Sequence, residues 1–323
     1  MRINTDWPFE PNKLKFYYGW IIWVASALGI LCTIPGQTVG IAAFTDSLIT
    51  ALNISRTELS MAYLIGTIAS SFYLTWAGKW FDVLGARIMI STASLCFSLS
   101  IVYLSFVDNI GSLLGGSTLG NLSVITLGFF LIRFLGQGAL TNYSRNALLL
   151  WFNEKRGLAV GMRTVIISFG FSTAPLFLSN AIEIVGWKET LWYLALIAGV
   201  GFTAIAFIFV RDNPKSCGLE MDGLISNYGI RTKKEVESAT LLQAKKNPIF
   251  WVYSLSFCAH AMFITAVIFH ITSIFAEAGK SPVEAFSYFV PAAIFSTTTN
   301  MVTSWLSDKI NLKPLLILML FVF

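Results

Sequence analysis

Long apolar runs that recur along the chain constrain its fold more than any other feature. Each run is about 20 residues long, enough for a helix to cross the hydrocarbon core of a bilayer, and short polar segments separate the runs. Only 12% of the 323 residues are charged and the mean hydropathy is +0.70, whereas soluble domains carry roughly 25% charged residues. Because unpaired backbone groups are costly in lipid, the spans must be helices. We therefore expect an all-α integral membrane protein.

The runs predict eight spans and the start of a ninth. The first is interrupted near its middle by Pro35-Gly36-Gln37, and Ser55 with Glu58 forms a capping-box pattern at the start of the second. Ten residues cannot cross a bilayer, so we expect a longer parent in which further spans follow the run 314–323. The predicted spans are 18–50, 57–80, 86–107, 122–151, a fifth that ends near 183, 187–210, 249–276 and 284–306.

The loops predict a division of the chain and an orientation. We expect a tail (1–17), a six-helix bundle (18–210), a basic linker (211–247) and a partial second bundle (248–323). If the N-terminus is cytoplasmic, sixteen of the 22 Lys and Arg residues lie inside and three lie outside, as the positive-inside rule demands. The net charge of +5 is therefore explained by orientation, without a nucleic-acid partner. We expect a multi-pass protein of a bacterial inner membrane.

One short polar break carries a fixed pattern, Gly78-Lys79-Trp80-Phe81-Asp82-Val83-Leu84-Gly85-Ala86-Arg87. Its glycines favour a turn, and Asp82 with Arg87 predicts a charge pair that holds two helices together at the membrane edge. Ser304-Trp305-Leu306-Ser307-Asp308 repeats the first half of the pattern 226 residues later. The repeat predicts two bundles of six helices, and hence a parent of about 450 residues.

Arginines within the spans are the main functional signal. Arg133, Arg145 and Arg163 fall inside apolar runs, where each arginine costs about 2.5–3.5 kcal/mol and marks a solute or ion route. No carboxylate lies at the same depth, so the uncompensated charge favours an anion, which Arg can hold through two parallel hydrogen bonds. Arg145 is the expected anchor, the alternative being a helix cap or a gate salt bridge. Arg133 is expected to be structural or coupling-related rather than a direct ligand, and Arg163 to extend toward the membrane surface.

Two of these patterns are similar to motifs of the major facilitator superfamily of transporters: the stretch from Gly78 to Arg87, and Arg133-Phe134-Leu135-Gly136-Gln137-Gly138 in span 4. Three further stretches resemble its monocarboxylate-porter and oxalate/formate-antiporter branch. The resemblance implies two bundles that rock around a central site by alternating access, with the 78–87 loop holding the inward-closed state. The gate residues that it implies are Gly78, Asp82, Gly85, Arg87, Arg133, Gly138 and Asp308. The branch-specific stretches are Tyr17-Tyr18-Gly19-Trp20, Arg156-Gly157-Leu158-Ala159-Val160-Gly161 and the segment from Asp212 to Gly223.

The expected function is secondary transport of a small organic anion, a monocarboxylate or a dicarboxylate. Gln37 provides either a helix–helix hydrogen bond or a substrate contact, and His260 is either an ordinary interior residue or a site sensitive to protons. No nucleophile–base pair, phosphate-binding loop or metal-ligand spacing suggests an enzyme. We expect a monomer without a cofactor, coupled to protons or to a counter-substrate. Alternatives are a receptor or scaffold that does not transport, and a carrier of another small solute. The expected substrate residues are Gln37, Tyr63, Asn142, Arg145 and His260.

Overall fold

The structure is a computed structural model that describes residues 7–222 and 241–307, together with 314 and 317. All secondary structure in these residues is helical. The N-terminal part comprises α1 (Gly19–Cys32), α2 (Thr38–Leu52), α3 (Arg56–Leu84), α4 (Ala86–Ser105), α5 (Val107–Leu113), α6 (Thr118–Ile132), α7 (Thr141–Trp151), α8 (Arg156–Val185), α9 (Trp187–Leu196) and α10 (Thr203–Phe209). The C-terminal part comprises α11 (Leu241–Lys246), α12 (Pro248–Phe269), α13 (Ile271–Glu277), α14 (Pro282–Ser287) and α15 (Phe289–Ser307).

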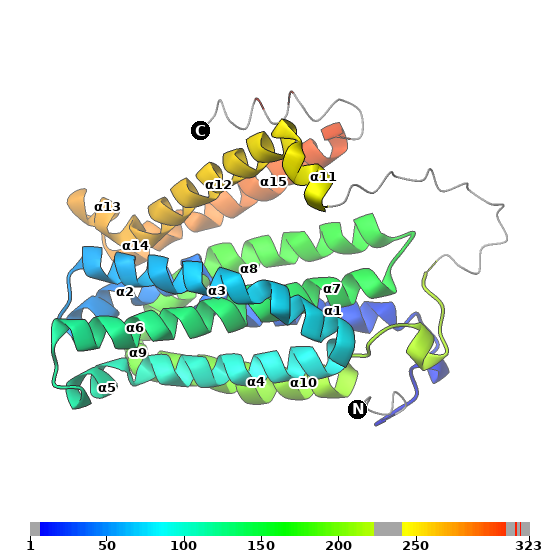
Figure 1. The fold of residues 1–323 in the computed structure, drawn as a ribbon, viewed down its shortest axis with the longest axis horizontal. Helices are drawn as coiled ribbons and strands as arrows, with labels where there is room; N and C mark the ends of the chain where they lie inside the picture. The colour runs from blue at the N-terminus through cyan, green and yellow to red at the C-terminus, as the bar shows by residue number, and fades with distance from the viewer. Residues whose placement is uncertain (1–6, 223–240, 308–313, 315–316, 318–323) are drawn as a thin grey trace.

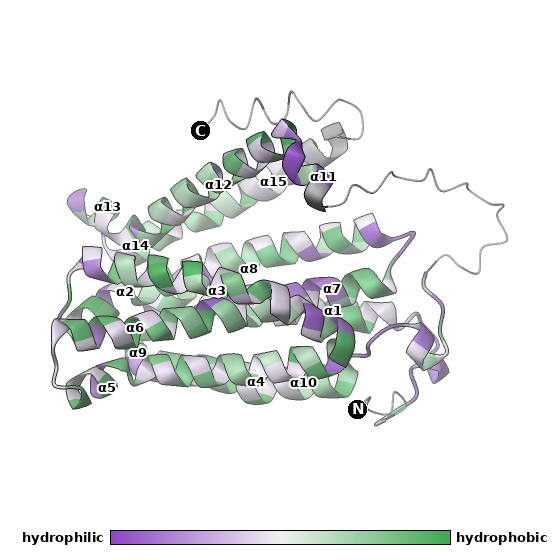
Figure 2. Cartoon of the chain, in the orientation of Figure 1, coloured by the Kyte–Doolittle hydropathy of each residue, from purple (hydrophilic) through white to green (hydrophobic). Residues whose placement is uncertain are grey.

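These helices agree with the expected membrane protein. Within the described residues, five helices are long and apolar enough to cross a membrane, counting α6 through α7 and α9 through α10 as one helix each. Figure 2 shows hydrophobic colour along the helix lengths and hydrophilic colour concentrated at helix ends and on α7. Asp308 lies outside the described residues, as does the predicted ninth span apart from residues 314 and 317.

The interruption predicted in the first span is present. The short 3-10 turn η2 (Ile34–Gly36) separates α1 from α2, and Gln37 has extended backbone angles. Pro35 cannot donate a backbone hydrogen bond and its ring disfavours a continuous helix. The predicted capping box at the start of α3 is also confirmed: the Ser55 side chain accepts from the amide of Glu58, whose carboxylate accepts from the amide of Ser55 at 2.7 Å.

The helices α1 to α10 pack around small residues that let backbones approach closely. Phe97 on α4 is fully buried, and its ring occupies the space where a Cβ would lie on Gly36 or Gly136. Gly66 on α3 lies equally close to the backbone of α6. These contacts place the broken middle of the first span directly against the middle of the fourth.

Hydroxyl groups add hydrogen bonds between spans. Ser94 and Ser98 on α4 donate to the carbonyl oxygens of Ala198 and Ala195, at 2.8 and 2.7 Å. Polar side chains in lipid need such partners, and serine hydrogen bonds join neighbouring helices. α4 is therefore fixed against the span that runs from α9 to α10.

The bundle has two distinguishable ends. The end that carries Arg87, Lys155, Arg156 and Arg211 is called here the basic end; at the opposite end, Lys188 pairs with Asp108 at 2.6 Å. In Figure 1, α12 and α15 lie closest to the bundle at the opposite end, beside α13 and α14, and slope away from α8 toward the basic end.

The contacts between the N-terminal and C-terminal helices follow this slope. α12 packs against α2, and α14 and α15 pack against α8. Phe269, the last residue of α12, is its one buried residue, and its ring lies 4.8 Å from that of Tyr63 on α3. The rest of α12 is exposed or half-buried. The two groups of helices thus meet at the opposite end and diverge toward the basic end.

Candidate functional site: buried and exposed arginines of the bundle

The span from α6 to α7 positions two of the three intramembrane arginines. Its middle is the π-helical segment η3 (Arg133–Leu140), and the hydroxyl of Thr141 donates back to the carbonyl oxygen of Gly136 at 3.0 Å, five residues earlier. π-helical turns inside α-helices are rare and often lie at functional sites. Arg133 is the first residue of this segment, and Arg145 lies on α7, five residues beyond its end.

Arg133 is buried beside the broken first span, with 7% of its surface exposed. Its Nη1 donates to the carbonyl oxygen of Gly36 at 3.3 Å, and its Cζ lies 5.1 Å from the ring centre of Tyr63. Its Nε is buried without an acceptor. The cation is therefore stabilised by a carbonyl and an aromatic face rather than by a carboxylate.

Tyr63 lies where the N-terminal and C-terminal helices meet. Its hydroxyl shares a 2.9 Å hydrogen bond with the hydroxyl of Thr38, and its ring packs between Phe129 at 5.3 Å and Phe269 at 4.8 Å. Only 5% of its surface is exposed. The structure thus places Tyr63 in the contact between the two groups of helices.

Gln37 makes the helix–helix hydrogen bonds that one of its two interpretations predicted. Its Nε2 donates to Thr33 at 2.9 Å and to Thr141 at 3.3 Å, linking the broken first span to the end of η3. The side chain is buried. Gly138 also has a packing role, because a Cβ at that position would overlap Leu74 of α3.

A row of exposed polar side chains runs along α7. Asn142, Arg145 and Asn146 are spaced three and four residues apart, and so they share one face of the helix; all three are exposed. Arg145 forms no hydrogen bond or ion pair with any described residue. A face with two amides and a guanidinium is unfavourable in hydrocarbon, so it is suited to an aqueous route.

The side chain of Arg163 on α8 is not where the sequence analysis expected it. The sequence suggested a side chain that extends toward the membrane surface, but Arg163 points into the bundle and only 5% of its surface is exposed. Its Nη1 donates to the hydroxyl of Ser26 on α1 at 2.8 Å, and that hydroxyl donates to the carbonyl oxygen of Ser144 at 2.6 Å. Arg163 is thereby connected to the residue next to Arg145.

His260 is half-buried on α12.

The turn in the 78–87 motif depends on Gly85, whereas Gly78 lies inside α3 with open space around it. Gly85 has φ +86° and ψ 166°, a conformation that is largely confined to glycine. A Cβ there would overlap the carboxylate of Asp212, which accepts a 3.0 Å hydrogen bond from the amide of Arg87. Asp212 thus places a negative charge at the N-terminus of α4, where it is favourable.

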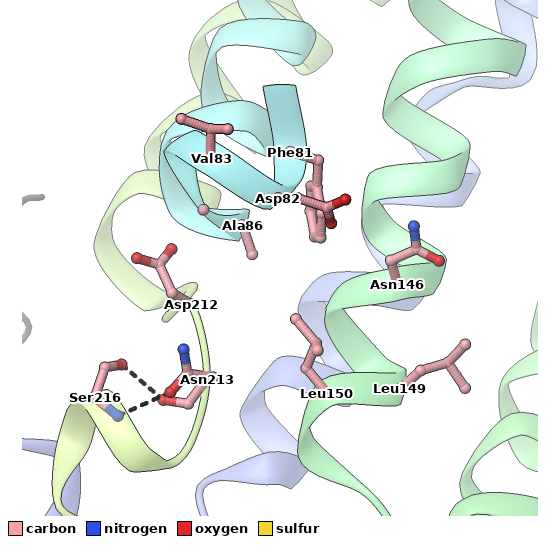
Figure 3. A pocket seen from close by; sticks show the side chains of 11 residues that line it. Phe81, Asp82, Val83, Ala86, Asn146, Leu149, Leu150, Asp212, Asn213 and Ser216 are labelled. Carbon is pink, nitrogen blue, oxygen red and sulfur yellow. Dashed lines mark hydrogen bonds between the residues drawn. The ribbon is translucent and has the colours of Figure 1, made fainter. Parts of the chain in front are cut away.

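The expected ion pair between Asp82 and Arg87 is not formed in the described structure. Arg87 is buried, with its Cζ 5.5 and 5.1 Å from the ring centres of Trp7 and Phe207 and its guanidinium donating to their carbonyl oxygens at 2.8 and 2.7 Å. Asp82 is exposed and lines a cavity of about 360 Å³ at the basic end. Figure 3 shows Asp82 on the side of this cavity that faces α7, which carries Asn146.

The segment that follows α10 holds the basic end together. Arg211 is fully buried and donates to the carbonyl oxygens of Ile208, Val210, Trp7 and Phe9. Asp222 accepts from the amides of Asn153 and Lys155 at the start of α8, the second at 2.8 Å. Sequence reasoning missed both acceptors, although Asp212 and Asp222 stood in a stretch singled out for its resemblance.

Tyr17 closes this end of the first span. Its hydroxyl donates to the carbonyl oxygen of Trp151, and its ring packs edge-on against Phe152 at 5.6 Å. Burial raises the pKa of Tyr17 to about 12. The hydroxyl therefore stays protonated, and remains a donor, throughout the physiological range.

Comparison with known proteins agrees with this geometry. The family model of the Major Facilitator Superfamily matches residues 19–323. The oxalate:formate antiporter of Oxalobacter formigenes is 21% identical over 240 residues, which are 74% of this chain and 51% of the antiporter. The chain thus spans about half the length of that relative. The comparison with solved structures gave no significant match.

Proposed function

Because the chain belongs to the Major Facilitator Superfamily, we propose that it carries a small organic anion across the membrane by alternating access. The observation that carries the proposal is the exposed guanidinium of Arg145, which has no carboxylate partner among the described residues. A carboxylate solute would pair with the Arg145 guanidinium through two parallel hydrogen bonds. Asn142 and Asn146, on the same face, supply donors and acceptors to the remainder of the solute.

The distribution of charge supports an anion over other solutes. Arg133 and Arg163 are buried in the same bundle, and no carboxylate of the described residues forms an ion pair with either. Buried unpaired charge is costly, so two such arginines in the bundle that carries the exposed Arg145 favour a functional role. The oxalate:formate antiporter carries carboxylates by its name, and small monocarboxylates and dicarboxylates are the candidates for this chain.

The divergence of the helices supports the expected transport cycle. The basic end faces the cytoplasm under the positive-inside rule, and α12 and α15 separate from the bundle toward that end (Figure 1). We infer an inward-facing arrangement, in which the contact between Tyr63 and Phe269 closes the opposite end. In this arrangement Asp82 is exposed, and we infer that it finds a partner when the cytoplasmic end closes. Coupling to protons or to a counter-substrate, a monomeric state and a bacterial inner membrane complete the proposal.

The test is uptake of labelled carboxylates by proteoliposomes that contain the full-length protein. Arg145→Gln is expected to lower anion uptake by at least tenfold, because a charge-assisted hydrogen bond contributes about 1.5–3 kcal/mol. The matched control is Arg156→Gln, which removes the same charge from an exposed arginine at the start of α8. Arg156 donates to the carbonyl oxygens of Leu149 and Phe152 at the end of α7. Unchanged uptake in Arg145→Gln would remove it as the anchor.

The same assay separates the alternatives. A receptor or scaffold would bind an anion without flux, and a carrier of another solute would give flux that carboxylates do not inhibit. Either result, obtained with folded protein, would overturn the proposed function.

A further inference from the structure

We propose that Arg163 is a second anion-binding residue beside Arg145, oriented by Ser26, and that it makes the site prefer doubly charged over singly charged anions. The inference rests on the proposed function, because it concerns the same solute. Its evidence is the unusual surroundings of Arg163, which differ from those of the structural arginines in this protein.

Arg211 and Arg87, the buried arginines of the basic end, each donate to several backbone carbonyl oxygens. Arg211 is fully buried and donates to four backbone carbonyl oxygens, with its Cζ 5.1 Å from the ring centre of Phe9. Arg87 lies against the rings of Trp7 and Phe207 and donates to the carbonyl oxygens of the same two residues. Carbonyl oxygens and aromatic faces together replace the water that a guanidinium loses on burial.

Arg163 is as buried as these two residues but lacks such surroundings. Of its five N–H donors, one meets an acceptor, the neutral hydroxyl of Ser26 at 2.8 Å. Its Nε is buried and has no acceptor, while Nη2 makes no hydrogen bond and is not closed off from solvent. No aromatic ring of the described residues lies over it. A cation so placed is ready for an anionic acceptor that arrives from outside.

The hydrogen bonds place this guanidinium next to Arg145. Ser26 accepts from Arg163 and donates to the carbonyl oxygen of Ser144 at 2.6 Å, so one serine joins α1, α7 and α8 at this depth. The positive charges of Arg145 and Arg163 repel each other. An anion between them offsets that repulsion, and two positive charges are best balanced by two negative ones.

The fold also suits this role. α8 packs against α14 and α15, and the hydroxyl of Thr297 lies 3.4 Å from that of Ser168 on α8. A solute held by Arg163 therefore lies beside α8, the N-terminal helix that also contacts α14 and α15 of the C-terminal part. The C-terminal helices α12 to α15 supply no Lys or Arg to this contact. Residues 248–307 contain one such residue, Lys280, which lies in the loop between α13 and α14.

The experiment compares dicarboxylates (oxalate, malonate, succinate) with monocarboxylates (formate, acetate) in the same proteoliposomes of the full-length protein. Arg163→Gln is expected to weaken dicarboxylate binding about 10- to 100-fold, which is the effect of losing one charge-assisted hydrogen-bonding group. Monocarboxylate binding is expected to weaken by less than about threefold, because Arg145 holds the single carboxylate. Arg145→Gln is expected to weaken both. An unchanged ratio of the two affinities in folded Arg163→Gln would overturn the inference.

Two further variants guard against misfolding. Arg163→Lys keeps the positive charge but removes the guanidinium, which can form two parallel hydrogen bonds with a carboxylate. Ser26→Ala keeps Arg163 but removes its hydrogen bond to α1. Each variant is expected to lower the dicarboxylate preference about three- to tenfold. If both variants are folded and keep the wild-type ratio, Arg163 does not bind the solute. Wild-type protein that moves neither class of anion would instead refute the proposed function itself.

Discussion

The contact between Gly85 and Asp212 allows a quantitative test of how the basic end is built. Alanine at position 85 must adopt φ +86°, at a cost of about 1–3 kcal/mol. Its Cβ would also displace the Asp212 carboxylate from the amide of Arg87, and losing a cap at a helix N-terminus costs about 0.5–2 kcal/mol. Gly85→Ala is therefore expected to destabilise the protein by about 2–4 kcal/mol in all.

Gly186 provides a matched control. It precedes α9 with φ +96° and ψ 158°, nearly the same conformation, but a Cβ there would meet only the flexible end of the Glu189 side chain. Gly186→Ala should thus show the backbone cost without the loss of a cap. We expect Gly85→Ala to be the more destabilising of the two by about 1 kcal/mol or more.

The assay is the thermal unfolding midpoint of the purified protein in detergent, with Asp212→Ala and the Gly85→Ala/Asp212→Ala double variant included. If alanine at 85 acts partly through Asp212, the double variant will be less destabilised than the sum of the single variants, by about 1 kcal/mol. Equal effects at Gly85 and Gly186, together with additive behaviour of the double variant, would refute the reasoning.

Two further predictions concern the basic end. Asp82→Asn should slow transport in proteoliposomes without lowering expression, because we infer that the exposed carboxylate is needed to close this end; unchanged uptake kinetics would contradict that role. Asp222→Asn should weaken the hydrogen bonds from the amides of Asn153 and Lys155 and so speed the hydrogen exchange of these amides. The control Glu220→Gln, at an exposed neighbouring position, should leave their exchange rates unchanged. Equal exchange in the two variants would count against the Asp222 contact.

The general architecture was accessible from sequence because it depends on local signals. Apolar length located the spans, Pro35 located the break, and Ser55 with Glu58 located the start of α3. Each of these signals is local in the sequence. The structure confirms the break and the capping box, and five of the eight expected spans correspond to described helices that are long and apolar enough to cross a membrane.

The partners of the charged residues were not accessible in the same way. Arg87 was expected to pair with Asp82, five residues away, but its amide is bonded to Asp212, 125 residues later. The burial of Arg163 depends on Ser26, 137 residues earlier. Such pairings follow from how whole spans pack, and periodicity within one span carries no information about them.

The wide turns of η3 decide which way the two arginines of the fourth span point. In a regular α-helix the twelve steps from Arg133 to Arg145 would rotate them about 120° apart. A stretch with i→i+5 bonding is wound more loosely than an α-helix, so η3 (Arg133–Leu140) changes that angle. Arg133 is buried and donates to the carbonyl oxygen of Gly36, whereas Arg145 lies on the exposed face of α7. One span therefore presents one cation to the packed interior and another to the outside, and any shift in the winding between them would turn the two charges relative to each other.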